Sequence, residues 1–430
     1  MNGFSDNISK AFESLGTVPD GVNAELAAKI RSDSLNTAKE VGLPGPRDEL
    51  WKYTNVSGLN STSFKTADTD TSQTLVKQQD IPLPCFASHR LVFVDGCLSE
   101  NLSATNDLPD EIKINSFSSL VDKDAETLTT SLSTHNEAAN VFTHINTSFV
   151  RDFVCIEVPD NFSAPSLEVL FLETGSGELN CPRLVVEVGE HSQFEIVETH
   201  CATKKSECLT NAVSKITAKR GAQISHYRLQ LDQSAHHIGN VELNAAADSR
   251  ISTYSFALGG DLTRIDINGA LNEPGGHIDM FGLFVAKGEQ HIDHHTRINH
   301  LAAHTTSNEN FKGIADDNGR GVFNGKIYVK QDAQKIAANQ SSKNLLLSNS
   351  AEIDTKPELE IYADDVQCAH GATVGQLRED ELFYPRARGI DVASARTMLT
   401  IAFAAEVFEE IQNEVVRDAI EKRVSDLILN

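Results

Sequence analysis

The sequence lacks the features that mark membrane-spanning, secreted and nucleic-acid-binding proteins. No apolar run approaches the roughly 18 residues needed to cross a bilayer, and residues 1–6 contain no basic segment leading into an apolar core. The seven cysteines are odd in number, widely spaced and free of any CxxC pair, which argues against a disulfide framework or a zinc ribbon. The formal net charge of −24 disfavours binding to nucleic acids or anionic membranes. We therefore expect a cytoplasmic protein.

Aromatic residues of the kinds that bind sugars are also scarce. The chain has one Trp and six Tyr, whereas polysaccharide grooves are usually lined with exposed aromatic side chains. The adjacent carboxylates Asp364 and Asp365 offer one pair for acid/base work, which in glycosidases requires carboxyl groups about 5 to 9.5 Å apart. The scarcity of Trp and Tyr weakens this possibility.

The first part of the chain predicts helices followed by a polar linker. Residues 5–42 read as two helices separated by Pro19–Gly21, with Gly42 ending the second. The only tryptophan, Trp51, is best explained as an aromatic anchor that packs a short helix onto the main body. Residues 60–80 are mostly Ser, Thr, Asp and Gln and predict a linker, and a further helix is expected near 141–149.

From about residue 154 to residue 377 the pattern changes to short runs of alternating apolar and polar residues. Within it a turn residue followed by an apolar strand start recurs, and the apolar anchors Phe194, Ile224, Ile251 and Ile278 lie 30, 27 and 27 residues apart. A near-constant period without helical patterning favours stacked coils that complete one another's cores. A β-sandwich, which also has many short strands, stays open at this point.

After Gly389 the pattern becomes helical with two apolar faces. Phe403, Val407, Ile411 and Val415 follow one face at steps of four residues, while Val416, Ile420 and Val424 follow another. One face can pack on the chain and the other on a partner. The alternative is a self-contained helical hairpin that caps the β stack.

The residues with the clearest chemistry are Cys368 and His370. In a strand, residues two apart project to the same side, so a thiolate and an imidazole would be presented together, a pair suited to a soft metal or to sulfur transfer. Continuing the alternation of Leu359 and Ile361 puts both on the polar side, facing solvent or a partner, unless a turn at 364–365 resets the phase.

A second candidate is the histidine-dense stretch from His291 to His304. On a strand, His291, Asp293 and His295 share one side and have the chemistry to ligate iron or zinc. Histidine and aspartate also form ladders of hydrogen bonds along stacked strands, and we favour this interpretation.

The segment 364–375, Asp-Asp-Val-Gln-Cys-Ala-His-Gly-Ala-Thr-Val-Gly, followed by Phe-Tyr-Pro-Arg-Ala-Arg-Gly-Ile at 383–390, resembles the signature of the SufB/SufD family of iron–sulfur cluster assembly proteins. Residues 47–54, Arg-Asp-Glu-Leu-Trp-Lys-Tyr-Thr, are similar to an element near the start of these proteins. Gly371 stands where the matching SufB motif has Glu. This glycine and the segment 353–361 are both similar to the SufD branch of the family.

The resemblance implies a mainly β fold: a right-handed parallel β-helix core flanked by N-terminal and C-terminal helical regions. It implies three regions, a helical region with a polar linker (1–85), the β-helix (86–385) and a C-terminal helical region (386–430). It further implies a non-catalytic scaffold that pairs through its last β-helix strands with a SufB-like paralogue, or with itself when isolated, and binds a SufC-like ATPase through the C-terminal helices.

By the same resemblance, His370 is expected to be a metal ligand or proton-transfer partner at that interface, with Cys368 as its neighbour. The cofactor would be a transient iron–sulfur cluster, or iron, shared with the partner, and a flavin is associated with the assembled complex. The alternative function is a β-helical enzyme that acts on a polysaccharide or uses the His291–His304 stretch as a metallohydrolase.

Overall fold

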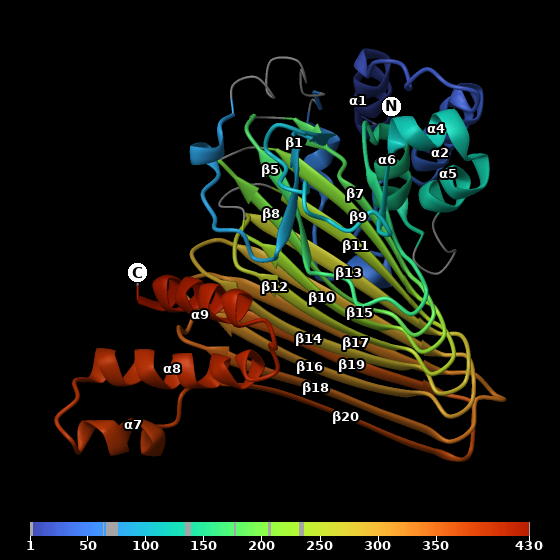
Figure 1. The fold of residues 1–430 in the computed structure, drawn as a ribbon. Helices are drawn as coiled ribbons and strands as arrows, with labels where there is room; N and C mark the ends of the chain where they lie inside the picture. The colour runs from blue at the N-terminus through green and yellow to red at the C-terminus, as the bar shows by residue number, and fades with distance from the viewer. Residues whose placement is uncertain are drawn as a thin grey trace.

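The protein is built around a parallel β-solenoid of about seven turns, in which the chain alternates between two facing sheets (Figure 1). The computed structural model describes residues 3–62, 64–65, 76–133, 139–175, 178–204, 208–231 and 236–429. Helices from the two ends of the chain flank the solenoid (Figure 1). The predicted mainly β class with flanking helical regions is confirmed.

The two sheets run the length of the solenoid. In order, the first contains β2 (Cys97–Leu98), β1 (His89–Val94), β5 (Leu167–Glu173), β8 (Gln193–Ala202), β10 (Gln223–Gln230), β12 (Arg250–Ala257), β14 (His277–Ala286), β16 (Thr306–Ala315), β18 (Ile336–Leu346) and β20 (Val366–Gly375). The second contains β19 (Glu352–Ile361), β17 (Arg320–Val329), β15 (His291–His300), β13 (Leu262–Leu271), β11 (His236–Ala245), β9 (Leu209–Ala218), β7 (Arg183–Val188), β4 (Val154–Val158) and β3 (Lys113–Ser116), with β6 (Leu179–Asn180) beside β9. All these pairs are parallel except β1–β2 and β3–β4.

The repeat seen in the sequence is the repeat of the solenoid. Phe194, Ile224, Ile251 and Ile278 lie in direct register on β8, β10, β12 and β14. All four belong to one apolar cluster between the sheets. Each turn therefore adds an apolar side chain to a row that its neighbours continue, and the choice between stacked coils and a sandwich is settled in favour of the coils.

Some interior positions have room only for glycine. A β-carbon at Gly313 or Gly321 would overlap the ring of Phe284, which is fully buried. The large ring fills space on two neighbouring turns, so the absence of a side chain at these glycines is part of the packing.

The N-terminal helices cover part of the second sheet. They are α1 (Gly3–Ser14), α2 (Ala24–Val41), α4 (Phe117–Lys123), α5 (Ala125–Leu132) and α6 (Val141–Phe149), with short 3-10 turns η1 (Glu49–Trp51), η2 (Ser57–Asn60) and η3 (Gln78–Asp80). The two helices expected within 5–42 and the helix expected at 141–149 are confirmed. The helices α4 and α5 lie where the sequence pattern indicated no element. Residues 63 and 66–75 of the expected linker lie outside the described residues.

Trp51 anchors this layer, as predicted. It is 5% exposed, its ring centroid lies 5.2 Å from that of Phe142 on α6, and the Arg264 guanidinium on β13 lies 3.7 Å above it. Asp48 caps the short helix by accepting a hydrogen bond from the Leu50 amide. The tryptophan thus joins the N-terminal segment to the outer face of the solenoid.

Of the three C-terminal helices, the last two pack on the outer face of the first sheet, and the first packs on the helix that follows it. The three helices are α7 (Glu379–Arg386), α8 (Val392–Phe408) and α9 (Glu414–Leu429). Tyr227, Tyr254 and Phe281 stack along β10, β12 and β14 with centroid separations of 4.7 and 5.2 Å, and they share one apolar cluster with α8 and α9. These helices therefore cover the side of the stack and leave β20 uncovered (Figure 1). Among the described residues, no helix combines the length and apolar character needed to span a bilayer.

We predict that Gly313→Ala destabilises the protein by about 1–3 kcal/mol, because the new methyl group must displace the Phe284 ring in a packed interior. Gly375→Ala on β20 is the matched control, since its methyl group would meet open space. Urea unfolding followed by circular dichroism measures both. Equal midpoints for the two variants would contradict this account of the interior.

Candidate functional site

The last turn of the solenoid, which we call the terminal rung and define as β19 and β20, is open on one side. In the described part of the chain, β20 pairs only with β18 and β19 only with β17. No residue of β20 is buried, and Ile353 is the one buried residue of β19. Backbone N–H and C=O groups along both edges are consequently free to pair with another chain.

Cys368 and His370 both lie on β20, side by side on one face. They are in register with Ala338 and Gln340 of β18, which are 4% and 1% exposed and face the interior. The two site residues therefore continue an inner row of the solenoid. Cys368 is partly exposed and His370 exposed because no further turn covers them.

This orientation comes from the bend at Asp364 and Asp365 between β19 and β20. Simple continuation of the β19 alternation would have put Cys368 and His370 on the outer, polar side. The bend carries the chain from one sheet to the other and resets the phase, which is the exception allowed for in the sequence analysis.

Cys368 sits at the apolar edge of the rung. It packs with Leu359, Ile361 and Val366 around a small cluster that includes Ala338. Burial raises the pKa of the Cys368 thiol, and a hydrogen bond involving the Ala338 backbone opposes this only in part. The thiol is therefore protonated at neutral pH. A thiol binds a metal as the thiolate, so it would have to lose this proton first.

A buried polar row lies directly beneath His370. Gln340 Nε2 donates to Glu309 Oε2 at 3.1 Å, and Thr296 Oγ1 donates to the same oxygen at 2.7 Å. Complete burial raises the pKa of Glu309 to about 7, and these two hydrogen bonds lower it only partly. Glu309, Gln340 and His370 therefore occupy one row on three successive strands of the first sheet, and the lower two are joined by a hydrogen bond. The sequence pattern does not single out Glu309 and Gln340, although their spacings of 31 and 30 residues from the next member of the row match the solenoid repeat.

The histidine-dense stretch forms β15 and its following turn, and its histidines on β15 are engaged in hydrogen bonds or ion pairs, whereas His304 in the turn is exposed. On the outer face, the Asp293 carboxylate lies 3.2 Å from Arg264 and 3.1 Å from His295, while His291 lies 2.9 Å from Thr54. Burial alone would raise the pKa of Asp293, but His295 and Arg264 hold it well below its usual range.

On the inner face of β15, His294 lies 3.1 Å from Ser255 and His300 lies 2.8 Å from Thr305. Across the described ranges, no group of three or more His, Cys, Asp or Glu side chains is arranged to hold a metal ion. The hydrogen-bond ladder is the interpretation that this geometry supports.

The four apolar residues predicted to follow one face of the C-terminal helices differ in their burial. Val407 and Ile411 are buried against the first sheet, Phe403 is partly buried, and Val415 is 52% exposed. Val407 and Ile411 are therefore already occupied by packing within the chain.

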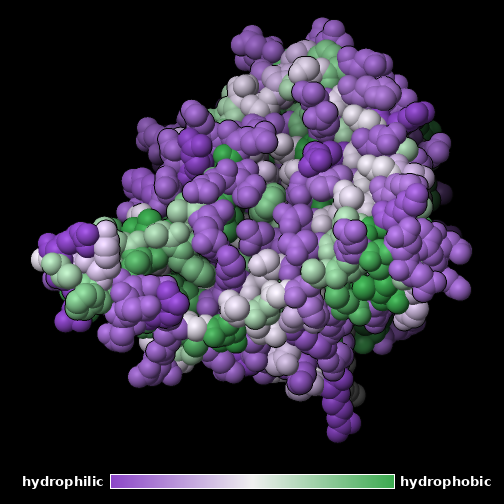
Figure 2. Space-filling view, turned by 90° about the horizontal axis from the view of Figure 1, so that it is seen from below, coloured by the Kyte–Doolittle hydropathy of each residue, from purple (hydrophilic) through white to green (hydrophobic). Residues whose placement is uncertain are grey.

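A different set of apolar side chains in this region is exposed: Phe383, Tyr384, Val392 and Met398. They lie on α7 and α8, and apolar side chains gather over these helices at the left of Figure 2. The Phe-Tyr pair belongs to the signature at 383–390, but the sequence alone does not show that these two side chains are exposed. Four of the remaining cysteines are buried as expected of structural thiols: Cys155, Cys181, Cys201 and Cys208.

Comparison with known proteins gives two family matches. Residues 171–403 match the family described as SUF system FeS cluster assembly, SufBD core domain, and residues 9–166 match the SufBD protein N-terminal region. An iron–sulfur cluster assembly SufBD family protein of Synechocystis is 33% identical over 403 residues, covering 91% of this chain and 89% of that protein. The iron–sulfur cluster assembly protein SufD of Escherichia coli is 32% identical over 391 residues, covering 89% of each chain. The chloroplastic protein ABCI7 of Arabidopsis thaliana is 28% identical over 411 residues, covering 93% of this chain and 86% of that protein.

We predict that Glu309→Gln makes the stability of the protein less dependent on pH. The folded-state pKa of about 7 lies above the ordinary value of 4.5, so the folded state prefers the protonated carboxyl. Protonated Glu309 therefore contributes its full stabilisation below pH 4.5. As the pH rises from 4.5 to about 7, this contribution to the free energy of unfolding is lost, at a cost on the order of 3 kcal/mol. The glutamine side chain of the variant does not titrate, so the variant does not lose this stability at higher pH.

Urea unfolding at pH 5 and pH 8 provides the measurement, with Glu190→Gln, at an exposed position, as the control. Glu309→Gln should gain stability relative to the unmodified protein at pH 8 but not at pH 5. The same pH profile in both variants would show that Glu309 does not titrate in this range.

Proposed function

Because this chain belongs to the SufB/SufD family of iron–sulfur cluster assembly proteins and is SufD-like, we propose that it serves as a non-catalytic scaffold subunit. In this role the terminal rung pairs with a SufB-like paralogue, and a nascent cluster is built where the two subunits meet. The observation that carries the proposal is the open rung, on which Cys368 and His370 continue an inner row with nothing above them.

The open edges support pairing with a second solenoid. An uncovered parallel strand offers regularly spaced backbone donors and acceptors, which another strand can satisfy by extending the sheet. A paralogue with the same two-sheet architecture could extend both sheets at once, through β19 and β20. The inner rows of the two solenoids would then meet, and the site residues would lie at the junction rather than on a free surface.

The side chains at the junction suit iron. A neutral imidazole binds iron directly, and a thiolate binds both iron and iron–sulfur clusters. Because burial raises the pKa of Cys368, metal binding there has to release a proton. His370, which is exposed, is the primary ligand in this proposal, and Cys368 is its neighbour. The cluster is cargo, shared with ligands supplied by the paralogue.

A SufC-like ATPase is proposed to bind the C-terminal region at the exposed surface of α7 and α8. Phe383 and Tyr384 are 69% and 64% exposed, and Met398 is 53% exposed. Such a group of large apolar side chains is typical of a protein interface. ATP-driven movement of the bound ATPase would be transmitted through α8, which packs on β14 and β16, to the neighbouring rungs.

The alternative of a metallohydrolase or polysaccharide-acting enzyme gains no support from the site geometry. Its candidate histidines and Asp293 are held in hydrogen bonds with Thr54, Arg264, Ser255 and Thr305.

We predict that His370→Ala lowers the iron and sulfide content of the assembled complex about tenfold or more, because a ligand of the nascent cluster is lost. Gln367→Ala is the matched control, since Gln367 is exposed on the same strand but faces the opposite side. Both variants are co-expressed and purified with SufB-like and SufC-like partners, and iron and acid-labile sulfide are measured. Full cluster content with His370→Ala would remove the site assignment and leave the scaffold proposal standing.

We predict that two point substitutions separate the two docking surfaces. Val374→Glu places a charge on the apolar part of β20 and should reduce recovery of the SufB-like paralogue, while recovery of the ATPase persists. Phe383→Asp on α7 should do the reverse. Each variant is the control for the other in affinity co-purification.

Point substitutions are preferable to removal of residues 391–430. That deletion would expose Tyr227, Tyr254 and Phe281 on the outer face of the first sheet, so misfolding would be confused with lost docking. Loss of both partners in either variant, or of neither, would contradict two separate surfaces.

A further inference from the structure

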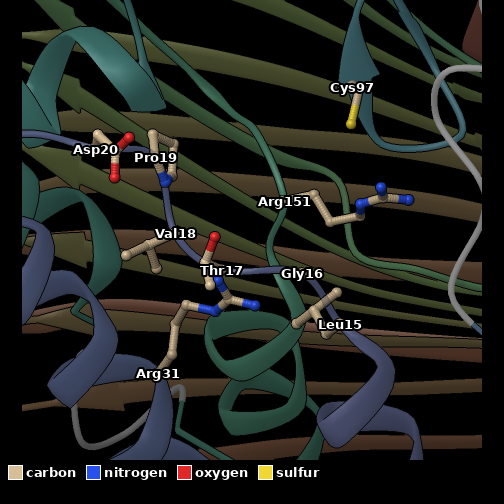
Figure 3. A pocket seen from close by; sticks show the side chains of 9 residues that line it. All are labelled: Leu15, Gly16, Thr17, Val18, Pro19, Asp20, Arg31, Cys97 and Arg151. Atoms are coloured by element: carbon tan, nitrogen blue, oxygen red, sulfur yellow. The ribbon is translucent and has the colours of Figure 1, made fainter.

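A polar cavity lies at the N-terminal end of the molecule, away from the terminal rung. Its volume is about 350 Å³, within the range of small-molecule sites. Four separate segments form its walls: the connection between α1 and α2, the middle of α2, β2, and the segment after α6 (Figure 3). The side chains that matter chemically are Thr17, Asp20, Arg31, Cys97 and Arg151.

Arg31 is the central feature of this cavity. It is only 5% exposed, and its Nε donates to the Ser148 carbonyl at 3.0 Å. Among the described residues, its two terminal nitrogens have no hydrogen-bond partner. In Figure 3 the guanidinium reaches up from α2 toward Gly16 and Thr17, so these nitrogens point into the cavity.

Among the described residues, no carboxylate is among the groups that act on the pKa of Arg31. Burial, followed by repulsion from Arg151, lowers the pKa of Arg31 to about 10. Asp20 lies at another end of the cavity in Figure 3 and is not among the groups that influence Arg31. A buried charge of this kind is costly unless an opposite charge is supplied.

The ring of Phe12 offers partial compensation. The Arg31 guanidinium carbon lies 5.7 Å from its centroid, close to the limit of a cation–π contact. That contact engages one face of the guanidinium plane and leaves the in-plane N–H donors free. These donors form the fork that matches an oxyanion.

We propose that this cavity binds a small oxyanion of the phosphate class, held by the terminal nitrogens of Arg31 with Arg151 as a second positive charge. The bound anion supplies the counter-charge that Arg31 lacks and ties the α1–α2 connection to the solenoid. The ligand is inorganic phosphate or the phosphate group of a small phosphate monoester. This site is independent of the proposed scaffold function.

Titration calorimetry with the full chain tests the proposal, with inorganic phosphate, glycerol 3-phosphate and acetate as probes at constant ionic strength. Saturable binding of at least one phosphate compound, with weaker binding of acetate, is expected. Tighter binding of glycerol 3-phosphate would identify the monoester as the source, and tighter binding of phosphate the inorganic ion. Because the chain carries a net charge of −24, general attraction of anions does not explain such binding. The absence of saturable binding overturns the proposal.

Arg31→Gln should weaken phosphate binding about tenfold or more, because charge-assisted hydrogen bonds are lost. Lys29→Gln is the matched control, since it removes one positive charge from an exposed position on the same helix. Equal binding by the two variants assigns phosphate to another place and overturns the site.

Protection of Cys97 provides a measurement that needs no substitution. Phosphate should slow alkylation of Cys97, which lines the cavity, while Cys85, which is exposed elsewhere, serves as the internal reference in peptide mass spectrometry. Equal alkylation of Cys97 with and without phosphate overturns the site even if Arg31→Gln fails to fold.

Discussion

Each strand of the solenoid depends on backbone hydrogen bonds to the strand above it and the strand below it. This constraint keeps Phe194, Ile224, Ile251 and Ile278 in one continuous row. It also means that a stack of this kind cannot satisfy its own last strand. The free edges of β19 and β20 are thus a direct consequence of the fold, and the site residues lie where the backbone most favours a partner.

Helices from the two ends of the chain cover parts of the outer faces of the sheets. Trp51 and the N-terminal helices pack on the second sheet, and α8 and α9 pack on the stacked aromatic residues of the first. Neither group of helices covers β20. The sides of the solenoid are therefore covered while its end at β19 and β20 stays open, and α7 and part of α8 carry exposed apolar side chains.

Buried polar side chains occur at several levels of the solenoid, and one such group lies beneath the candidate site. Glu309, Thr296 and Gln340 form a buried hydrogen-bonded group one and two rungs below His370. A carboxyl group with a pKa of about 7 in this position can gain or lose a proton at physiological pH. This carboxyl group lies two strands below His370 in the same row of the first sheet.

The sequence by itself determined the family signature, the repeat period, the N-terminal and C-terminal helical regions and the pairing of Cys368 with His370, because these depend on local patterns. It could not determine that the pair faces inward, since this depends on the bend at Asp364 and Asp365, nor that Val407 and Ile411 are covered, since both helical faces are apolar. Glu309 reached the site only through stacking. The tertiary structure decided which side chains share a row and which row ends uncovered, because both are set by contacts between turns about 30 residues apart.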